Sequence, residues 1–270
     1  MTKGFTKTAL GTAALRCALA VSSVAVTSSA QAAACPSPTC VTSNAIFGSG
    51  NDNGSFKITQ AGGIELGLRA KVRFPTPLNV FNYDGVSTYT FASGEGSPGR
   101  PLWNFEWSIN SDYKNGSLPI DTYNYLLEFD INPTSATDFD LSYAFDPIHA
   151  PNPGAGGQVL WDHSFGNNST AQGAGVEATD AANYLFLRQN NNLVQNSWAF
   201  NWFAPIDPNI KGAEYAIKLT ALDKNSGDEI ASTQINVVTT PIPGALFLFA
   251  SGLGALGYAG RKKMKKADTA

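Results

Sequence analysis

Two histidines and two aspartates are the residues of this chain best suited to metal or acid–base chemistry. His149 and His163 lie within the irregular segment 147–180, Asp162 precedes the second histidine, and Asp146 lies just before the segment. Imidazole and carboxylate groups bind transition metals and act as general bases. Their spacing does not follow the HExxH pattern, and histidines of Gly-, Asn- and Pro-rich loops are commonly solvated. The sequence therefore predicts no metal site and no cofactor.

Paired carboxylates are the second candidate chemistry, because glycosidases use two acids flanking the scissile bond. Glu106 with Glu128 is such a pair in this chain. Both fall in predicted strands, on the polar face opposite the aromatic residues. A solvent-exposed strand face explains two glutamates there without a catalytic role. No serine nucleophile elbow, P-loop or dinucleotide fingerprint is present. We therefore expect a non-enzymatic protein, and a polysaccharide hydrolase stays as an alternative.

Five tryptophans form the most suggestive group, because aromatic faces stack on sugar rings. Trp103 and Trp107 share strand parity, as do Trp198 and Trp202, and same-face aromatics of a strand usually pack in the core. Trp161 lies in the long irregular segment and is expected to be exposed. It is the candidate sugar platform of a second alternative, a secreted carbohydrate-binding module.

The elements that would position these residues are strands. Apolar and polar residues alternate with period two between Cys35 and Thr240, most clearly in GIELGLRAKVRF. There one face carries Ile64, Leu66, Leu68, Ala70, Val72 and Phe74, and the other carries Glu65, Arg69, Lys71 and Arg73. This pattern predicts a half-buried strand. Further strands are predicted at 55–59, 86–92, 103–109, 123–131, 140–145, 184–188, 197–203, 214–222 and 229–238.

Turn sequences such as NDNG, KNGS and DKNSGDE separate these strands. No helix of ordinary length is predicted before Gly244. About ten short strands punctuated by turns predict an all-β fold, an antiparallel β-sandwich of jelly-roll or immunoglobulin-like type. Charged residues make up only 14% of the chain, which favours an exported all-β protein over a helical enzyme.

Charge is distributed unevenly along the chain. Eight of the 18 Lys and Arg residues lie in the two terminal segments, and 20 of the 21 Asp and Glu residues lie between them. The central part therefore carries a net charge of about −10. Such a surface repels phosphate backbones, so no nucleic acid partner is expected.

The N-terminal segment is typical of a secretory signal peptide. Lys3 and Lys7 form a basic leader, residues 13–26 are mostly apolar, and Ala30-Gln31-Ala32 is a small-residue cleavage box. We assign residues 1–34 to this signal and residues 35–238 to the β-sandwich domain.

Cys35 and Cys40 are the only cysteines of the mature chain, because Cys17 leaves with the signal peptide. They bracket CPSPTC, and export places this tight loop where thiols are oxidised, so a disulfide is predicted. A zinc site lacks two further ligands nearby. A lipid-modified Cys35 is disfavoured because alanines precede it where a lipobox has Leu.

The C-terminal segment has the layout of a membrane anchor. Residues 244–260 carry no charge and span roughly 25 Å as a helix, close to the ~30 Å hydrocarbon core of a bilayer. A basic tail, 261–266, follows and contains Arg261, Lys262, Lys263, Lys265 and Lys266. By the positive-inside rule the tail stays cytoplasmic and the β domain lies outside the membrane.

The segment 239–270 resembles the PEP-CTERM sorting signal. Pro241-Ile242-Pro243-Gly244 precedes the apolar stretch, the basic tail follows it, and the arrangement is closest to the variant whose motif reads Val-Pro-Leu-Pro-Ala. Thr239-Thr240 stand where that signal usually has a short polar spacer. Ile242 occupies the position of the glutamate that gives the family its name.

The resemblance implies an exosortase as partner, a membrane-embedded, cysteine transpeptidase-like enzyme of Gram-negative bacteria that make exopolysaccharide. We expect a cell-surface or extracellular-matrix protein with a structural or adhesive role in a biofilm. It is held transiently in the inner membrane by its C-terminal helix before it reaches the cell surface.

Overall fold

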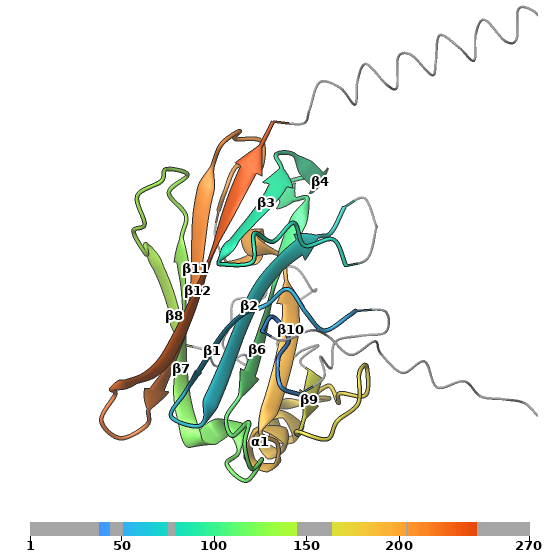
Figure 1. Ribbon diagram of the computed structural model, residues 1–270, viewed down its shortest axis with the longest axis vertical. Coiled ribbons are helices and arrows are strands. Elements are labelled where there is room, and N and C mark those ends of the chain that lie inside the picture. The colour runs from blue at the N-terminus through green and yellow to red at the C-terminus, as the bar shows by residue number, and fades with distance from the viewer. Residues whose placement is uncertain (1–37, 44–50, 75–78, 145–163, 204, 242–270) are drawn as a thin grey trace, which may run out of the picture. The chain divides into compact units, whose positions relative to one another are not determined.

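A computed structural model describes residues 38–43, 51–74, 79–144, 164–203 and 205–241 (Figure 1). Strands make up most of the regular secondary structure of these residues and helices only a small part, so the predicted all-β class is confirmed. The strands are β1 (Lys57–Ala61), β2 (Ile64–Val72), β3 (Thr88–Ala92), β4 (Glu95–Ser97), β5 (Arg100–Pro101), β6 (Trp103–Asn110), β7 (Tyr123–Asp130), β8 (Leu141–Ala144), β9 (Ser164–Gly166), β10 (Leu193–Trp198), β11 (Glu214–Asp223) and β12 (Glu229–Thr240). The helical elements are α1 (Ala181–Asn190) and two 3₁₀ turns, η1 (Ile120–Thr122) and η2 (Phe200–Trp202).

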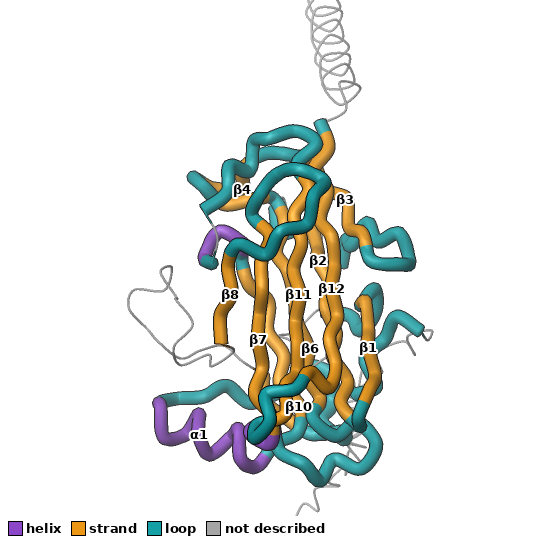
Figure 2. Tube along the Cα trace, turned by 90° about the vertical axis from the view of Figure 1, so that its left-hand side faces the viewer, coloured by secondary structure: helices purple, strands orange, loops and turns teal. Residues whose placement is uncertain are grey.

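Two five-stranded sheets account for most of the strands. Sheet A has the order β1-β2-β6-β10-β9 and sheet B the order β3-β12-β11-β7-β8, while β4 and β5 form a separate small hairpin. Neighbouring strands of both sheets are antiparallel except β3 and β12, which run parallel. This pair departs from the predicted all-antiparallel arrangement. In both views α1 lies at one end of the long strands and β4 at the other (Figures 1 and 2).

The sheets share one hydrophobic core, to which β2, β3, β6, β7, β11 and β12 contribute alternate residues. Leu66, Leu68 and Ala70 of β2 lie opposite Ile109, Trp107 and Phe105 of β6, and all six are buried. The ring of Phe105 meets that of Phe129 from β7 edge-on, with centroids 5.5 Å apart, and so joins the two sheets. Aromatic pairs in this geometry stabilise a fold by about 0.5–1.5 kcal/mol beyond the area they bury.

Helix α1 corrects two predictions. The segment 184–188 was predicted to be a strand, and no helix was expected before Gly244. Instead Asp180 caps a ten-residue helix by accepting a hydrogen bond from the backbone N–H of Asn183 at 2.8 Å. Tyr184 and Leu187, three residues apart, point into the structure and are buried. The cap and this spacing outweigh the short alternation of Tyr184, Phe186 and Arg188.

The predicted strand 197–203 is also corrected. β10 ends at Trp198, and the chain then turns through η2, which brings Phe200 and Phe203 into the core. The other predicted strands are confirmed with small shifts at their ends. Strands β4, β5 and β9 were not predicted, and each has only two or three residues.

The turn after β6 is organised by one carboxylate. Asp112 accepts hydrogen bonds from the backbone N–H groups of Asn115 and Ser117, each at 3.0 Å, and from the Ser117 hydroxyl at 2.8 Å. Burial by itself raises the pKa of Asp112, but these hydrogen bonds outweigh it and lower the pKa to about 2. The folded state therefore favours the ionised carboxylate.

This turn gives a prediction for acid stability. Because the folded-state pKa of Asp112 lies below its ordinary value of 3.8, its stabilisation is complete above pH 4 and is lost as the pH falls towards 2. Urea unfolding at several pH values should show a smaller loss of unfolding free energy between pH 4 and 2 in Asp112→Asn than in the wild type. Asp228→Asn, at an exposed position, serves as control. If the unfolding free energy of Asp112→Asn falls with pH as steeply as that of the wild type, this role of Asp112 is contradicted.

Candidate functional site

A buried ion cluster lies on the outer face of sheet A. The Nε of Arg69 donates to Oε2 of Glu106 at 2.5 Å, and the ammonium of Lys71 pairs with Oε1 of the same carboxylate. The side chains of Arg69 and Glu106 are fully buried and that of Lys71 is 8% exposed. The prediction that this polar face is solvated is therefore wrong.

The segment before β1 covers this cluster. One terminal nitrogen of Arg69, Nη1, donates to the carbonyl oxygens of Asp52 at 2.8 Å and Gly54 at 2.6 Å. The guanidinium lies over two rings, 4.2 Å from the centre of Phe56 and 4.4 Å from that of Phe81. The arginine thus fixes the segment to the sheet through hydrogen bonds and cation–π contacts.

Burial and charge act in opposite directions on this cluster. Burial raises the pKa of Glu106, but the charges of Arg69 and Lys71 outweigh it and hold the pKa below the usual glutamate value. Burial lowers the pKa of Lys71, and Glu106 only partly offsets this. A carboxylate kept ionised and enclosed by two cations is unsuited to donate a proton to a substrate. The cluster is an anchor of the fold.

The second carboxylate of the candidate pair lies elsewhere. Glu128 of β7 is on the outer face of sheet B, where it pairs with Lys218 at 3.4 Å and both side chains are partly exposed. Its neighbour Phe129 packs against Phe105, the neighbour of Glu106, in the core between the sheets. Glu106 and Glu128 thus face away from each other, and the structure does not bring them together.

The tryptophan predictions have mixed outcomes. Trp103, Trp107 and Trp198 are buried in the core as predicted, with at most 5% exposed. Trp202 is only partly buried and packs at the edge of the core from η2. Trp161, the candidate sugar platform, lies outside the described residues.

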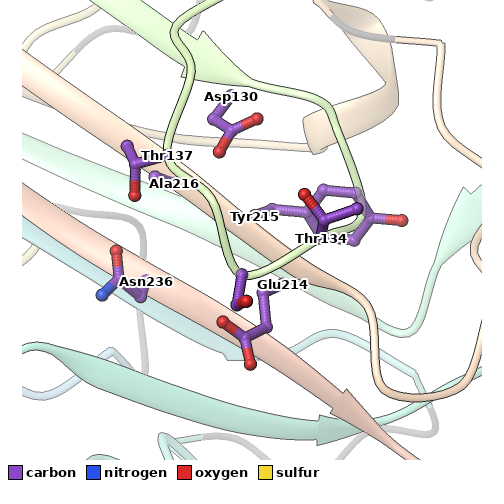
Figure 3. Close-up of a pocket in the computed structure, with 8 residues that line it drawn as sticks. Asp130, Thr134, Thr137, Glu214, Tyr215, Ala216 and Asn236 are labelled. Atoms are coloured by element: carbon purple, nitrogen blue, oxygen red, sulfur yellow. The ribbon is translucent and has the colours of Figure 1, made fainter.

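A small polar pocket, which was not predicted, lies on the outer face of sheet B (Figure 3). It has an empty volume of about 260 Å³, partly open to solvent, and is lined by Asp130, Thr134, Ser135, Thr137, Glu214, Tyr215, Ala216 and Asn236. Both carboxylate oxygens of Asp130 are engaged by the loop above it, through the N–H groups of Asn132 at 2.9 Å and Asp138 at 3.2 Å.

Only about 50 Å³ of this space can hold water-sized molecules, far less than the roughly 300–1,000 Å³ of the largely apolar cavities that hold small molecules. Asp130, Ala216 and Asn236 are cross-strand neighbours on the outer face of sheet B. Their outward orientation could have been predicted from the alternation in each strand. The loop that closes the pocket from residue 131 to 140 has no such signal.

The junction with the predicted sorting signal is the best-defined of the predicted sites. β12 continues to Thr240, so Thr239 and Thr240 belong to the sheet and are not a flexible spacer. The buried hydroxyl of Thr239 donates to the carbonyl of Ile210 at 2.8 Å and accepts from the N–H of Ala213 at 3.0 Å. Pro241, the next residue, is exposed.

The remaining predicted site residues lie mostly outside the described ranges. These are Ile242, Pro243 and Gly244 of the sorting motif, the membrane helix 244–260, the basic tail 261–266, and the group formed by Asp146, His149, Asp162 and His163. Cys40 is disulfide-bonded, and Cys35 also lies outside, so the pairing of the two stays a prediction. No helix within the described ranges is both long and apolar enough to span a membrane.

Comparisons with protein-family models, curated proteins and solved structures find no match for this chain.

The ion cluster gives a stability prediction. Glu106→Gln should lower the unfolding free energy by about 3 kcal/mol, because it leaves the buried charge of Arg69 without its carboxylate. Glu128→Gln is the matched control, since it breaks a partly exposed ion pair and should cost less than about 1 kcal/mol. Urea denaturation of the two variants measures the difference. Equal stability of Glu106→Gln and wild type would refute the anchoring role.

Proposed function

We propose that this chain is an exported protein of the cell surface or extracellular matrix, sorted through its C-terminal segment by an exosortase. The observation that carries the proposal is the position of the motif Pro241-Ile242-Pro243-Gly244 relative to the fold. Its first residue is exposed and directly follows the last residue of β12. The motif therefore begins directly after the last described strand.

This position suits a processing site for two reasons. A protease or transpeptidase needs an extended and accessible backbone, and the prolines disfavour helix and sheet pairing around them. In addition, the residues up to Thr240 are held by their own contacts. The backbone N–H of Ser93 donates to the carbonyl of Thr240 at 2.8 Å, and the hydroxyl of Thr240 donates to that of Phe91 at 3.2 Å. Cleavage beyond Thr240 would leave the described fold whole.

The anchor follows from the sequence that comes next. An uncharged stretch at 244–260 followed by five cations stops translocation and retains the tail in the cytoplasm, so the β domain remains outside the inner membrane. Exosortase processing then releases or transfers the domain to the cell surface.

A structural or adhesive role in a biofilm matrix fits the domain itself. We propose that the two packed sheets form a sandwich of jelly-roll or immunoglobulin-like type. The domain carries about ten more acidic than basic residues, and a net charge of this size favours solubility outside the cell.

The sorting proposal is tested by replacing both prolines of the motif. The double variant Pro241→Ala, Pro243→Ala should accumulate as an uncleaved, membrane-bound form in a host that has the sorting enzyme, because the junction loses its extended backbone. Immunoblots of membrane and extracellular fractions measure the ratio of the two forms. Pro205→Ala, at an exposed position within the domain, is the control and should be processed as the wild type is.

Normal processing of the double variant would count against the motif as the recognised element. Extraction of the uncleaved form from membranes at high pH would count against the anchor.

A further inference from the structure

Arg73 and Arg100 have no acidic partner among the described residues. The ion pairs of the described residues join Arg69 and Lys71 to Glu106, and Lys218 to Glu128. Within the part of the chain that the structure describes, neither Arg73 nor Arg100 forms an ion pair. Since acidic residues outnumber basic ones in this domain two to one, unpaired arginines require an explanation.

The two arginines converge on one aromatic ring. Their guanidinium carbons lie 5.7 and 5.3 Å from the centre of the Phe74 ring, and that of Arg100 also lies 5.3 Å from the ring of Trp202. Arg73 is exposed, and Arg100, Phe74 and Trp202 are half-buried. The site therefore presents two positive charges and partly accessible aromatic surface at one place.

The surrounding backbone fixes this arrangement. The N–H groups of Arg73 and Phe74 both donate to the carbonyl of Leu102, at 2.6 and 3.0 Å. The Phe74 ring lies directly on Gly96 of β4, where an added Cβ would come within 2.0 Å of a ring carbon. The end of β2, the β4–β5 hairpin and η2 thus hold the site in place.

Arg100 lacks compensation for its partial burial. Its Nε is buried and has no hydrogen-bond partner. Burial lowers the pKa of Arg100, and the nearby charge of Arg73 lowers it further. Two like charges at one ring disfavour the unliganded state, and an anion bound at the exposed Arg73 beside Arg100 would offset their repulsion.

Nearby acidic residues do not supply that anion. Glu95 on β4 accepts a hydrogen bond from the side-chain amide of Asn209 at 2.9 Å, and Asp207 accepts one from the backbone N–H of Asn209 at 2.9 Å. Both are exposed, and Asn209 rather than an arginine is their partner.

We propose that Arg73, Arg100 and Trp202 form a binding site for a carboxylate-bearing sugar, that is, a uronate unit of an acidic polysaccharide. The planar guanidinium fork matches a carboxylate in two parallel hydrogen bonds. Trp202 offers an amphipathic ring against which the sugar ring packs. The choice of a sugar as carrier of the carboxylate rests on the proposed matrix function, whereas the anion site rests on the geometry alone.

The test measures binding of uronate oligosaccharides to the purified full chain in detergent. Oligogalacturonate should bind, and the carboxyl-reduced oligosaccharide of the same length should not. Arg73→Gln and Arg100→Gln should each weaken binding by about tenfold, the loss expected for one charge-assisted hydrogen bond. Lys114→Gln is the matched control, since it removes a cation that lies 5.6 Å from the ring of Tyr113 elsewhere on the domain, and it should bind as the wild type does.

Three results would overturn the proposal: equal binding of the carboxyl-reduced oligosaccharide, wild-type affinity of Arg73→Gln, or full displacement by inorganic phosphate at matched ionic strength. The last would mean a site for any oxyanion. Arg73 is exposed, so its variant remains informative even if Arg100→Gln folds poorly. The binding assay uses purified protein and is independent of sorting. If the chain is sorted normally but does not bind the oligosaccharide, only this site is overturned. If sorting fails, the binding result still stands.

Discussion

The burial of the Glu106 carboxylate is the constraint on which the outer side of sheet A depends. An ionised carboxylate enclosed in a protein is tolerated only with close cationic partners, and Arg69 and Lys71 provide them. Further donors of these two residues find acceptors in the carbonyls of Asp52 and Gly54 and in the side chain of Asn51. The chain before β1 must therefore cross the sheet at this place. β2 and β6 are consequently covered on both faces, although β2 alternates as if one face met water.

The register of β2 also explains which of its cationic side chains have an acidic partner. Residues 69, 71 and 73 project to one side of β2 and its extension. The register sets Glu106 opposite Arg69 and Asn104 opposite Lys71, so one carboxylate serves two cations. Arg73 comes after the last paired position and lies at the rim of the sheet, exposed to solvent and next to the Phe74 ring that Arg100 also contacts. The register therefore explains both why Arg69 and Lys71 share a carboxylate and why Arg73, beyond the end of the pairing, has none.

Period two was sufficient to locate most long strands and the inward-facing Trp103, Trp107 and Trp198. It was insufficient for the polar face of β2, because alternation does not reveal what covers a face, and Glu106 is 37 residues from Arg69 along the chain. The helix α1 was accessible from sequence through Asp180 as an N-cap followed by two alanines, a signal that the five-residue window 184–188 hid. The arginine–aromatic site brings together residues from three separate elements, and no local pattern relates Arg73 to Arg100 or Trp202. β4, β5 and β9 have only two or three residues each, too few to show an alternating pattern.

The place of β12 within sheet B has a mechanical consequence. This strand is flanked by β3 on one side and β11 on the other, and the chain leaves it at Thr240 towards the C-terminus. Hydrogen bonds between strands lie across the strand direction. Tension applied at the C-terminal end of β12 therefore acts along the strand and shears its hydrogen bonds to both β3 and β11. These bonds must break together rather than one after another. A domain tethered through this end would resist pulling far better than one whose terminal strand peels from a sheet edge.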